Sequence, residues 1–213
     1  MPSYETVIYE VQDRVATITL NRPERLNAMN QKLKDELREV WRAVKNDPDV
    51  WCAILTGAGR AFSTGADVEG LATGGFRRED RWRELALIEG IVDLPTPRRQ
   101  RVHKPVIAAV NGATAGFSLD FVTESDIPIA SETAYFVDPH VSIGLVASHE
   151  MVNMARRAEN VGERFPEEAR RIHYDEAPAR TIRGTATADE TRELLDEGIA
   201  VLPAPVPPED EIH

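Results

Sequence analysis

Two segments of the sequence share one pattern, in which an apolar stretch leads through small residues into a helix start. The first is Arg60–Asp67, RAFSTGAD, and the second is Lys104–Phe117, KPVIAAVNGATAGF. Backbone N–H groups at helix starts lack intrahelical acceptors and favour negative charge. Glycine and alanine let a ligand approach the backbone closely. Two such segments facing each other predict a pair of N–H donors around one oxyanion.

The composition is that of an ordinary globular protein and excludes several classes of function. The chain has 213 residues, of which 42% are hydrophobic and 29% charged, which suits one domain with a C-terminal appendage. A formal net charge of −11 argues against nonspecific nucleic-acid binding. No apolar run approaches the roughly 18 residues of a membrane span, and the N-terminal residues lack a secretory signal pattern. The single cysteine, Cys52, excludes an internal disulfide, and these features together favour a cytoplasmic protein.

Hydrophobic periodicity predicts alternating strands and helices. We expect a β-hairpin from Val7–Val11 and Val15–Leu20, a helix that begins at Asn30, and buried strands at Trp51–Thr56 and Val106–Val110. This β–α–β succession favours a sheet with a parallel portion. The later elements are expected as helices at Arg81–Val92 and Ala115–Glu124, a strand at Asp126–Ala130, and a short helical pattern within Ala188–Val201.

Three ordered motifs resemble the crotonase (enoyl-CoA hydratase/isomerase) superfamily. They are Leu20–Met29, LNRPERLNAM, then Ala61–Asp67, then Lys104–Leu145, and the likeness runs from about Thr6 to Met154. The resemblance implies an α/β fold, with a ββα spiral core of mixed sheets and a helical C-terminal segment that is altered here. It also implies a homo-oligomer, a trimer or hexamer, that acts on an acyl-CoA thioester. No metal and no cofactor besides the CoA of the substrate are expected.

The chain is expected to have three regions. Residues 1–157 form the core, and residues 158–202 form a partly helical segment that does not align with the long helical segment of the superfamily. Residues 203–213 are acidic and proline-rich, which predicts disorder. The sequence ends earlier than the superfamily pattern. A truncation, a frameshift or a lineage-specific tail would each produce this ending.

The resemblance assigns catalytic roles by position in the motifs. The N–H groups of Ala66 and Phe117 would form the oxyanion hole, although the second position is usually glycine. Hydratases of the superfamily use two glutamates, and the matching positions here are Asp120 and His140. Both side chains are capable of proton transfer, and a carboxylate that orients an imidazole holds a proton in a defined place. We therefore expect Asp120 and His140 to act as an acid–base pair.

The same motifs place further residues near the CoA moiety. Because CoA is anionic and the chain is acidic, its site needs local positive charge, from Arg22 with Arg25 or from Arg98–Lys104. A solvated loop is the alternative for each cluster. We expect Asp67 to cap the helix or form a salt bridge rather than to catalyse. The residues assigned to substrate or CoA binding are Arg25, Asn27, Ala28, Met29, Gly65, Asp67 and Gly116.

The sequence leaves the reaction open. An Asp–His pair suits hydration of an enoyl thioester or a 1,3-proton shift. His140 follows Pro139 in the turn Asp138-Pro139-His140. A histidine after the proline of this turn resembles relatives that cleave carbon–carbon bonds in β-diketones, and His149 stands where some of them carry an acid. Loss of both glutamates equally fits a non-catalytic binding or assembly protein. Glu124, one helical turn after Asp120, is expected at the surface.

Overall fold

The computed structural model describes residues 4–67, 94–140, 142 and 149–201. The chain divides into two compact units, Met1–Ala147 and Ser148–His213, and each has its own hydrophobic core. The helix expected at Arg81–Val92 lies outside the described residues. Within the described ranges, no helix combines the length and apolar character that crossing a membrane would require.

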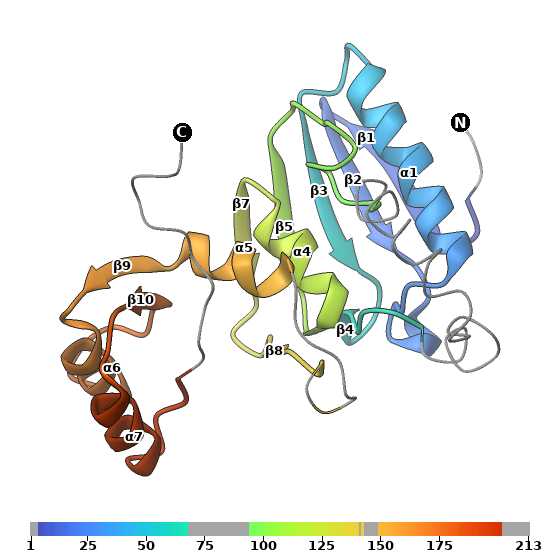
Figure 1. The fold of residues 1–213 in the computed structure, drawn as a ribbon. Coiled ribbons are helices and arrows are strands. Elements are labelled where there is room, and N and C mark those ends of the chain that lie inside the picture. The colour runs from blue at the N-terminus through green and yellow to red at the C-terminus, as the bar shows by residue number, and fades with distance from the viewer. Residues whose placement is uncertain (1–3, 68–93, 141, 143–148, 202–213) are drawn as a thin grey trace, which may run out of the picture. The chain divides into compact units, whose positions relative to one another are not determined.

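The first unit contains two sheets (Figure 1). In the larger sheet, β1 and β2 are antiparallel and the remaining neighbours are parallel. The smaller sheet is parallel throughout. The larger sheet has the order β1 (Val7–Gln12), β2 (Val15–Leu20), β3 (Cys52–Gly57), β5 (Val106–Val110), β7 (Ile127–Ala130), and the smaller has the order β4 (Ala61–Ser63), β6 (Ala113–Ala115), β8 (Phe136–Val137).

The chain alternates between the two sheets as it advances. Strand β3 leads to β4, β5 leads to β6, and β7 leads to β8, so each pair gives one strand to each sheet. The 3-10 helix Gly116–Ser118 and helix α4 (Leu119–Thr123) connect β6 to β7. Parallel neighbours require such crossover connections. This arrangement confirms the predicted α/β class with a ββα spiral and mixed sheets.

Helix α1 (Gln31–Asn46) supplies much of the core of this unit. The side chain of Asn30 accepts the Leu33 N–H at 2.9 Å and caps the helix as its sequence position predicts. The apolar stripe packs in one cluster with Ile18 and Leu55 of the larger sheet. Each fully buried large aliphatic side chain contributes about 1.5–3 kcal/mol to this packing. The members of the stripe, each with 0% exposed surface, are Leu33, Leu37, Val40, Trp41 and Val44.

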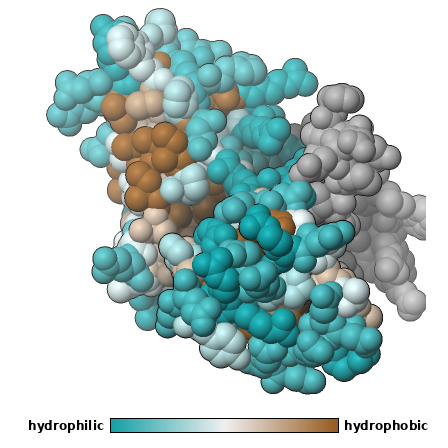
Figure 2. Space-filling view, turned by 90° about the vertical axis from the view of Figure 1, so that its left-hand side faces the viewer, coloured by the Kyte–Doolittle hydropathy of each residue, from teal (hydrophilic) through white to brown (hydrophobic). Residues whose placement is uncertain are grey.

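Apolar side chains are also exposed at the edge of the larger sheet. Strand register aligns Ile54 with Ile107 and Ile107 with Ile127 on one face. Ile127 and Ile129 of the edge strand β7 are 51% and 57% exposed. Figure 2 shows that hydrophobic surface gathers in one area of the face that it presents. In the described part of the larger sheet, one face is therefore buried beneath α1, and the edge strand β7 exposes apolar side chains.

The second unit is a small α/β assembly. Strands β9 and β10 are parallel, and the helices α6 and α7 pack around Leu194, which has 0% exposed surface. Thr187 and Glu190 form a reciprocal capping box at the start of α7, within the helical pattern predicted for Ala188–Val201. The elements are α5 (His149–Arg157), β9 (Glu159–Gly162), α6 (Phe165–His173), β10 (Ile182–Gly184) and α7 (Ala188–Asp196).

Candidate active site

The two segments predicted to form an oxyanion hole meet at Gly65. This residue has φ of +84°, and a β-carbon there would lie 2.7 Å from the Ala115 carbonyl oxygen and 3.4 Å from the Phe117 nitrogen. Real β-carbons do not approach backbone oxygens so closely, and L side chains rarely adopt this backbone conformation. Glycine at position 65 therefore allows the two backbone segments to touch.

The orientation of the two predicted donors follows from the local pairing. Ala66 forms a parallel bridge with Met29, in which Met29 N–H donates to Gly65 at 2.7 Å and Asp67 N–H donates to Met29 at 3.1 Å. In such a bridge the central residue turns its own N–H to the opposite side. Ala66, which is exposed, therefore directs its N–H away from Met29. Phe117 lies in the first turn of a helix, where N–H groups have no intrahelical acceptor.

The Phe117 side chain, which replaces the usual glycine, packs on its own helix. Its ring lies edge-to-face against Phe121, with 5.4 Å between the ring centroids. Phe121 has 0% exposed surface and belongs to the core, and Phe117 packs against the same cluster. Such aromatic pairs contribute about 0.5–1.5 kcal/mol beyond their buried area. The bulky side chain is therefore accommodated by packing against Phe121 and the core cluster.

Two buried serines connect the segments, and the sequence analysis did not single them out. Ser63 Oγ donates to the Asn27 carbonyl at 2.8 Å. Ser118 Oγ lies 2.9 Å from both Ser63 Oγ and the Ala115 carbonyl. Both serines have 0% exposed surface. The sequence did offer one signal for them, because each motif has a serine beside its run of small residues.

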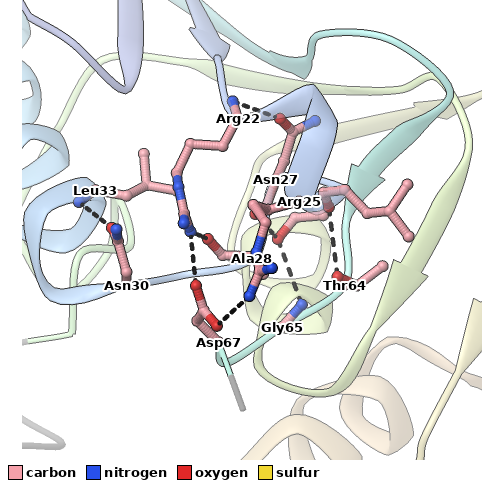
Figure 3. A network of polar contacts seen from close by, with 11 residues as sticks. Arg22, Arg25, Asn27, Ala28, Asn30, Leu33, Thr64, Gly65 and Asp67 are labelled. Carbon is pink, nitrogen blue, oxygen red and sulfur yellow. Dashed lines mark hydrogen bonds and ion pairs between the residues drawn. The ribbon is translucent and has the colours of Figure 1, made fainter. Parts of the chain in front are cut away.

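An ion-pair network joins the loop Arg22–Met29 to Asp67 (Figure 3). Arg22 Nη1 donates to Asp67 Oδ2 at 3.0 Å and also donates to the Ala28 carbonyl. Arg25, at the end of the 3-10 helix Pro23–Arg25, places Nη2 3.6 Å from Asp67 Oδ1. The predicted salt bridge of Asp67 is confirmed. The carboxylate of Asp67 thus holds both arginines of the loop Arg22–Met29.

The Asn27 side chain lies in the interior, where it holds this loop in shape. Its Oδ1 accepts the Arg22 N–H at 2.9 Å, and its Nδ2 donates to the carbonyls of Ala58 and Ala61 at 2.9 Å each. Asn27 has 0% exposed surface, and Met29 is 2% exposed within the core cluster. The motif assigned these two residues to the substrate, but their side chains are buried and stabilise the loop from the interior of the protein.

Asp120 and Glu124 are both buried on helix α4 and its C-terminal end. Asp120 has 0% exposed surface, and the Glu124 side chain is 3% exposed, so the expectation of a surface position for Glu124 is wrong. Thr96 Oγ1 donates to Glu124 Oε2, and Arg99 Nε lies 3.6 Å from Oε1. Burial raises the pKa of Glu124 above its usual value, and the charge of Asp120 adds to this against the opposing effects of Thr96 and Arg99.

The basic segment Arg98–Lys104 uses some of its cations within the protein. Arg99 is paired with Glu124, and Lys104 Nζ donates to the carbonyl of Asp47 at the end of α1. These contacts attach the segment to the core of the first unit. They give two of its cations structural roles, whichever role the rest of the segment has toward CoA.

The turn that follows β8 packs Pro139, the residue before His140, against the second of the two predicted oxyanion segments. Pro139 Cγ and Cδ lie 3.7 and 3.8 Å from the point that a β-carbon on Gly116 would occupy. Asp138 Oδ1 accepts the His140 N–H at 3.1 Å and contacts His140 Nδ1. The sequence analysis treated Asp138 only as part of the turn, although its spacing from His140 is typical of an aspartate that folds back on its own backbone.

His140 thus contacts the carboxylate of Asp138, and the pairing of Asp120 with His140 stays a prediction. His149 belongs to the second unit, where it begins helix α5. The candidate site described above is made of residues of the first unit.

A comparison with known protein families shows which family this chain belongs to. A family model described as enoyl-CoA hydratase/isomerase matches residues 10–190. The chain belongs to the enoyl-CoA hydratase/isomerase family. The predicted membership of the crotonase superfamily is confirmed, and the match continues past the predicted core into the second unit.

Curated members of the enoyl-CoA hydratase/isomerase family match about two thirds to three quarters of the chain. A protein of Mycobacterium tuberculosis named probable enoyl-CoA hydratase is 35% identical over 159 residues, which are 74% of this chain and 59% of that protein. One of Rhodobacter capsulatus with the same description is 36% identical over 146 residues, which are 68% of this chain and 53% of that protein. The chain therefore spans little more than half the length of these relatives.

A solved structure from the same family has the same fold. The crystal structure of an enoyl-CoA hydratase/isomerase from Mycobacterium paratuberculosis superposes with a TM-score of 0.61 at 45% sequence identity. The superposition covers 74% of this chain and 57% of that one. The spiral core is therefore shared with a protein of the family whose structure was determined by experiment.

Proposed function

We propose that the protein acts on an acyl-CoA thioester through an enolate whose oxygen is held by the N–H groups of Ala66 and Phe117. The observation that carries the proposal is the contact of Gly65 with Ala115 and Phe117, which brings the two donor segments to one place. Preorganised backbone donors of this kind are worth about 3 kcal/mol each to a developing oxyanion. Membership of the enoyl-CoA hydratase/isomerase family supports the substrate class.

The proposed acid–base groups are Asp120 and His140. One of them takes a proton from the α-carbon of the thioester, and the electron pair of the C–H bond passes to the thioester oxygen. Return of the proton to the γ-carbon of an enoyl substrate gives isomerisation. In hydration the pair instead takes a proton from water as the water oxygen bonds to the β-carbon. The electron pair of the C=C bond then passes to the thioester oxygen, and a proton is delivered to the α-carbon. Burial of Asp120 on α4 and attachment of the His140 turn to Gly116 support these roles. The chemistry uses CoA only as part of the substrate.

The experiment that tests the proposal is exchange of the α-proton with solvent. The full chain is incubated in D₂O with a panel of saturated and enoyl-CoA thioesters, and deuterium uptake is followed by mass spectrometry. We expect uptake by the wild-type protein and a rate at least about 10²-fold lower in Asp120→Asn and His140→Gln. Glu132→Gln serves as a control for loss of an acid at an exposed position.

The outcomes separate catalysis from binding. Uptake that disappears in both variants supports enolate chemistry, and the products then distinguish hydration, isomerisation and carbon–carbon cleavage. Binding of CoA without exchange of any thioester would overturn the proposal in favour of a non-catalytic binding or assembly role. Equal rates in wild type and both variants would overturn the assignment of Asp120 and His140.

A further inference from the structure

Asp138 and His140 contact each other across Pro139 in the turn that follows β8. A single carboxylate oxygen, Asp138 Oδ1, accepts the backbone N–H of His140 at 3.1 Å and contacts the Nδ1 atom of its ring. The two side chains are 21% and 16% exposed. Because one oxygen contacts both the backbone and the ring of the same residue, the imidazole is fixed relative to the turn.

This contact determines which ring nitrogen carries the proton. A carboxylate in its ionised form only accepts hydrogen bonds, so Nδ1 is the donor in this contact when Asp138 is ionised. A neutral imidazole has one protonated nitrogen, and its other nitrogen is then the basic atom. In His140 that basic atom is Nε2.

We propose that Asp138 is a positioning residue that holds neutral His140 in the Nδ1–H form, so that Nε2 is the atom that accepts the substrate proton. The proposal rests on the proposed function for the role of His140 in enolate chemistry. In that step the α-C–H proton moves to Nε2, which gives an imidazolium and an enolate. The Nδ1–H bond to Asp138 is kept throughout, and the carboxylate offsets the new positive charge.

The position of the turn connects this arrangement to the oxyanion segments. Pro139, between the two partners, lies against Gly116, with its Cγ 3.7 Å from the point that a β-carbon there would occupy. Gly116 immediately precedes Phe117, which carries one of the proposed oxyanion donors. The turn that carries the proposed base therefore packs against the backbone segment that would hold the enolate oxygen.

A purely structural role for Asp138 makes a different prediction. If Asp138 served only to accept the His140 backbone N–H, a neutral asparagine at the same place would suffice for folding, and the ring tautomer would not matter. The proposed role requires an acceptor for Nδ1–H, and a charged one to stabilise the imidazolium. The tautomer of His140 is thus a readout that a structural role alone would not change.

The test is a measurement of the His140 tautomer by ¹H–¹⁵N NMR on the full chain, at a pH of about 8 where imidazoles are neutral. His140→Gln identifies its signals among the five histidines. We expect the Nδ1–H form in the wild type and a shift toward Nε2–H in Asp138→Ala, with Asp138→Asn intermediate. Glu132→Ala, which removes an exposed acid, should leave the tautomer unchanged.

Activity is measured beside the NMR signal. We expect Asp138→Ala to lower the turnover of α-proton exchange about 10- to 100-fold while KM changes little. Asp138→Asn provides a variant that keeps the backbone hydrogen bond of the turn. Circular dichroism and thermal unfolding show whether each variant is folded.

Failure of the proposal is distinguishable from failure of the proposed function. An Nε2–H tautomer in the wild type, or an unchanged tautomer in Asp138→Ala, overturns the role of Asp138 whatever the activity. A tautomer that shifts as expected in a protein that exchanges no α-proton supports the role of Asp138 toward His140 and overturns the proposed function.

Discussion

Gly65 approaches Ala115 so closely that a β-carbon at position 65 would lie 2.7 Å from the Ala115 carbonyl oxygen. The reason lies in the sheet that precedes both residues. Gly65 comes shortly after β4 and Ala115 ends β6, and these strands are parallel neighbours in the smaller sheet. Segments that leave the carboxyl ends of parallel neighbours emerge at the same edge, so two distant motifs meet at one place.

The first prediction concerns this contact. Gly65→Ala should destabilise the first unit by roughly 3 kcal/mol or more, because the new methyl group meets backbone and φ is +84°. Gly198→Ala is the matched control, since Gly198 has φ of +83° and no atom within 4 Å of the added β-carbon. The control should cost only the backbone strain, about 1–2 kcal/mol. Chemical denaturation is measured on the transition of the unit that carries each residue, and equal losses would contradict the close approach.

Helix α1 and the strands β1, β2, β3, β5 and β7 were predictable because their hydrophobic periods are regular, whereas the three-residue strands β4 and β6 are too short to show a period. The stripe on α1 and the alternation in β1 and β2 each have one buried face, and the structure places them as the sequence predicts. The connection of these elements into a spiral of two sheets came from the resemblance. Periodicity alone does not specify which strands become neighbours, since that depends on contacts between segments far apart in the chain.

The burial of Glu124 was not predictable from its own helix. A glutamate one turn after Asp120 is typical of a solvated helix face. The residues that contact Glu124 are Thr96 and Arg99, which come much earlier in the sequence, and Thr96 precedes Glu124 by 28 positions. Asp138 was missed for the opposite reason. Its partner His140 is so near in sequence that the pattern indicated only a turn.

The second prediction tests the interior role of Asn27, a residue that the motif assigns to the substrate. Asn27→Ala should lower the free energy of unfolding by roughly 2–4 kcal/mol, because the Ala58 carbonyl loses its side-chain donor and the Arg22 N–H loses its acceptor. The Ala61 carbonyl loses its 2.9 Å bond from Asn27 and keeps the longer one from Asn111 Nδ2, at 3.3 Å. Asn30→Ala, which removes only the cap of α1, should cost about 1 kcal/mol. Thermal or chemical denaturation compares the two. A loss in Asn27→Ala no larger than in Asn30→Ala would favour a ligand-facing Asn27.

The third prediction is a pH dependence of stability that depends on Glu124. Burial raises the pKa of its carboxyl group above the usual 4.5, so the folded state binds this proton more tightly than the unfolded state. The stability linked to this group is fully present below pH 4.5 and is lost as pH rises through the folded pKa. Glu124→Gln should therefore gain stability relative to wild type as pH rises above 4.5, in unfolding experiments at a series of pH values.

Glu36 provides the control of opposite sign for this experiment. Burial opposes ionisation of Glu36, but hydrogen bonds from Thr6 and from the backbone of Glu5 outweigh it and lower the pKa of Glu36 below 4.5. Its contribution is present above pH 4.5 and is lost as pH falls through the folded pKa. Wild type should therefore gain stability over Glu36→Gln as pH rises. Parallel curves for the two variants would contradict the burial of Glu124.

The fourth prediction separates the two arginines that share Asp67. Arg22 is 14% exposed and is bonded both to Asp67 and to the Ala28 carbonyl, whereas Arg25 is 37% exposed and lies 3.6 Å from the carboxylate. We expect Arg22→Ala to lower stability by about 2 kcal/mol, because it leaves a buried carbonyl without its donor. Arg25→Ala should change stability little, since partly exposed ion pairs are worth about 0–1 kcal/mol.

The affinity for CoA should depend on Arg25 rather than on Arg22. If Arg25 contacts the phosphates of CoA, Arg25→Ala should raise the Kd for CoA about fivefold at low salt, which corresponds to about 1 kcal/mol. Addition of salt should shrink this difference, because screening at about 1 M reduces the reach of a charge to about 3 Å. Isothermal titration calorimetry at two salt concentrations measures both effects. Unchanged affinity in Arg25→Ala at low salt would remove Arg25 from the CoA site and leave the Asp67 network a structural role alone.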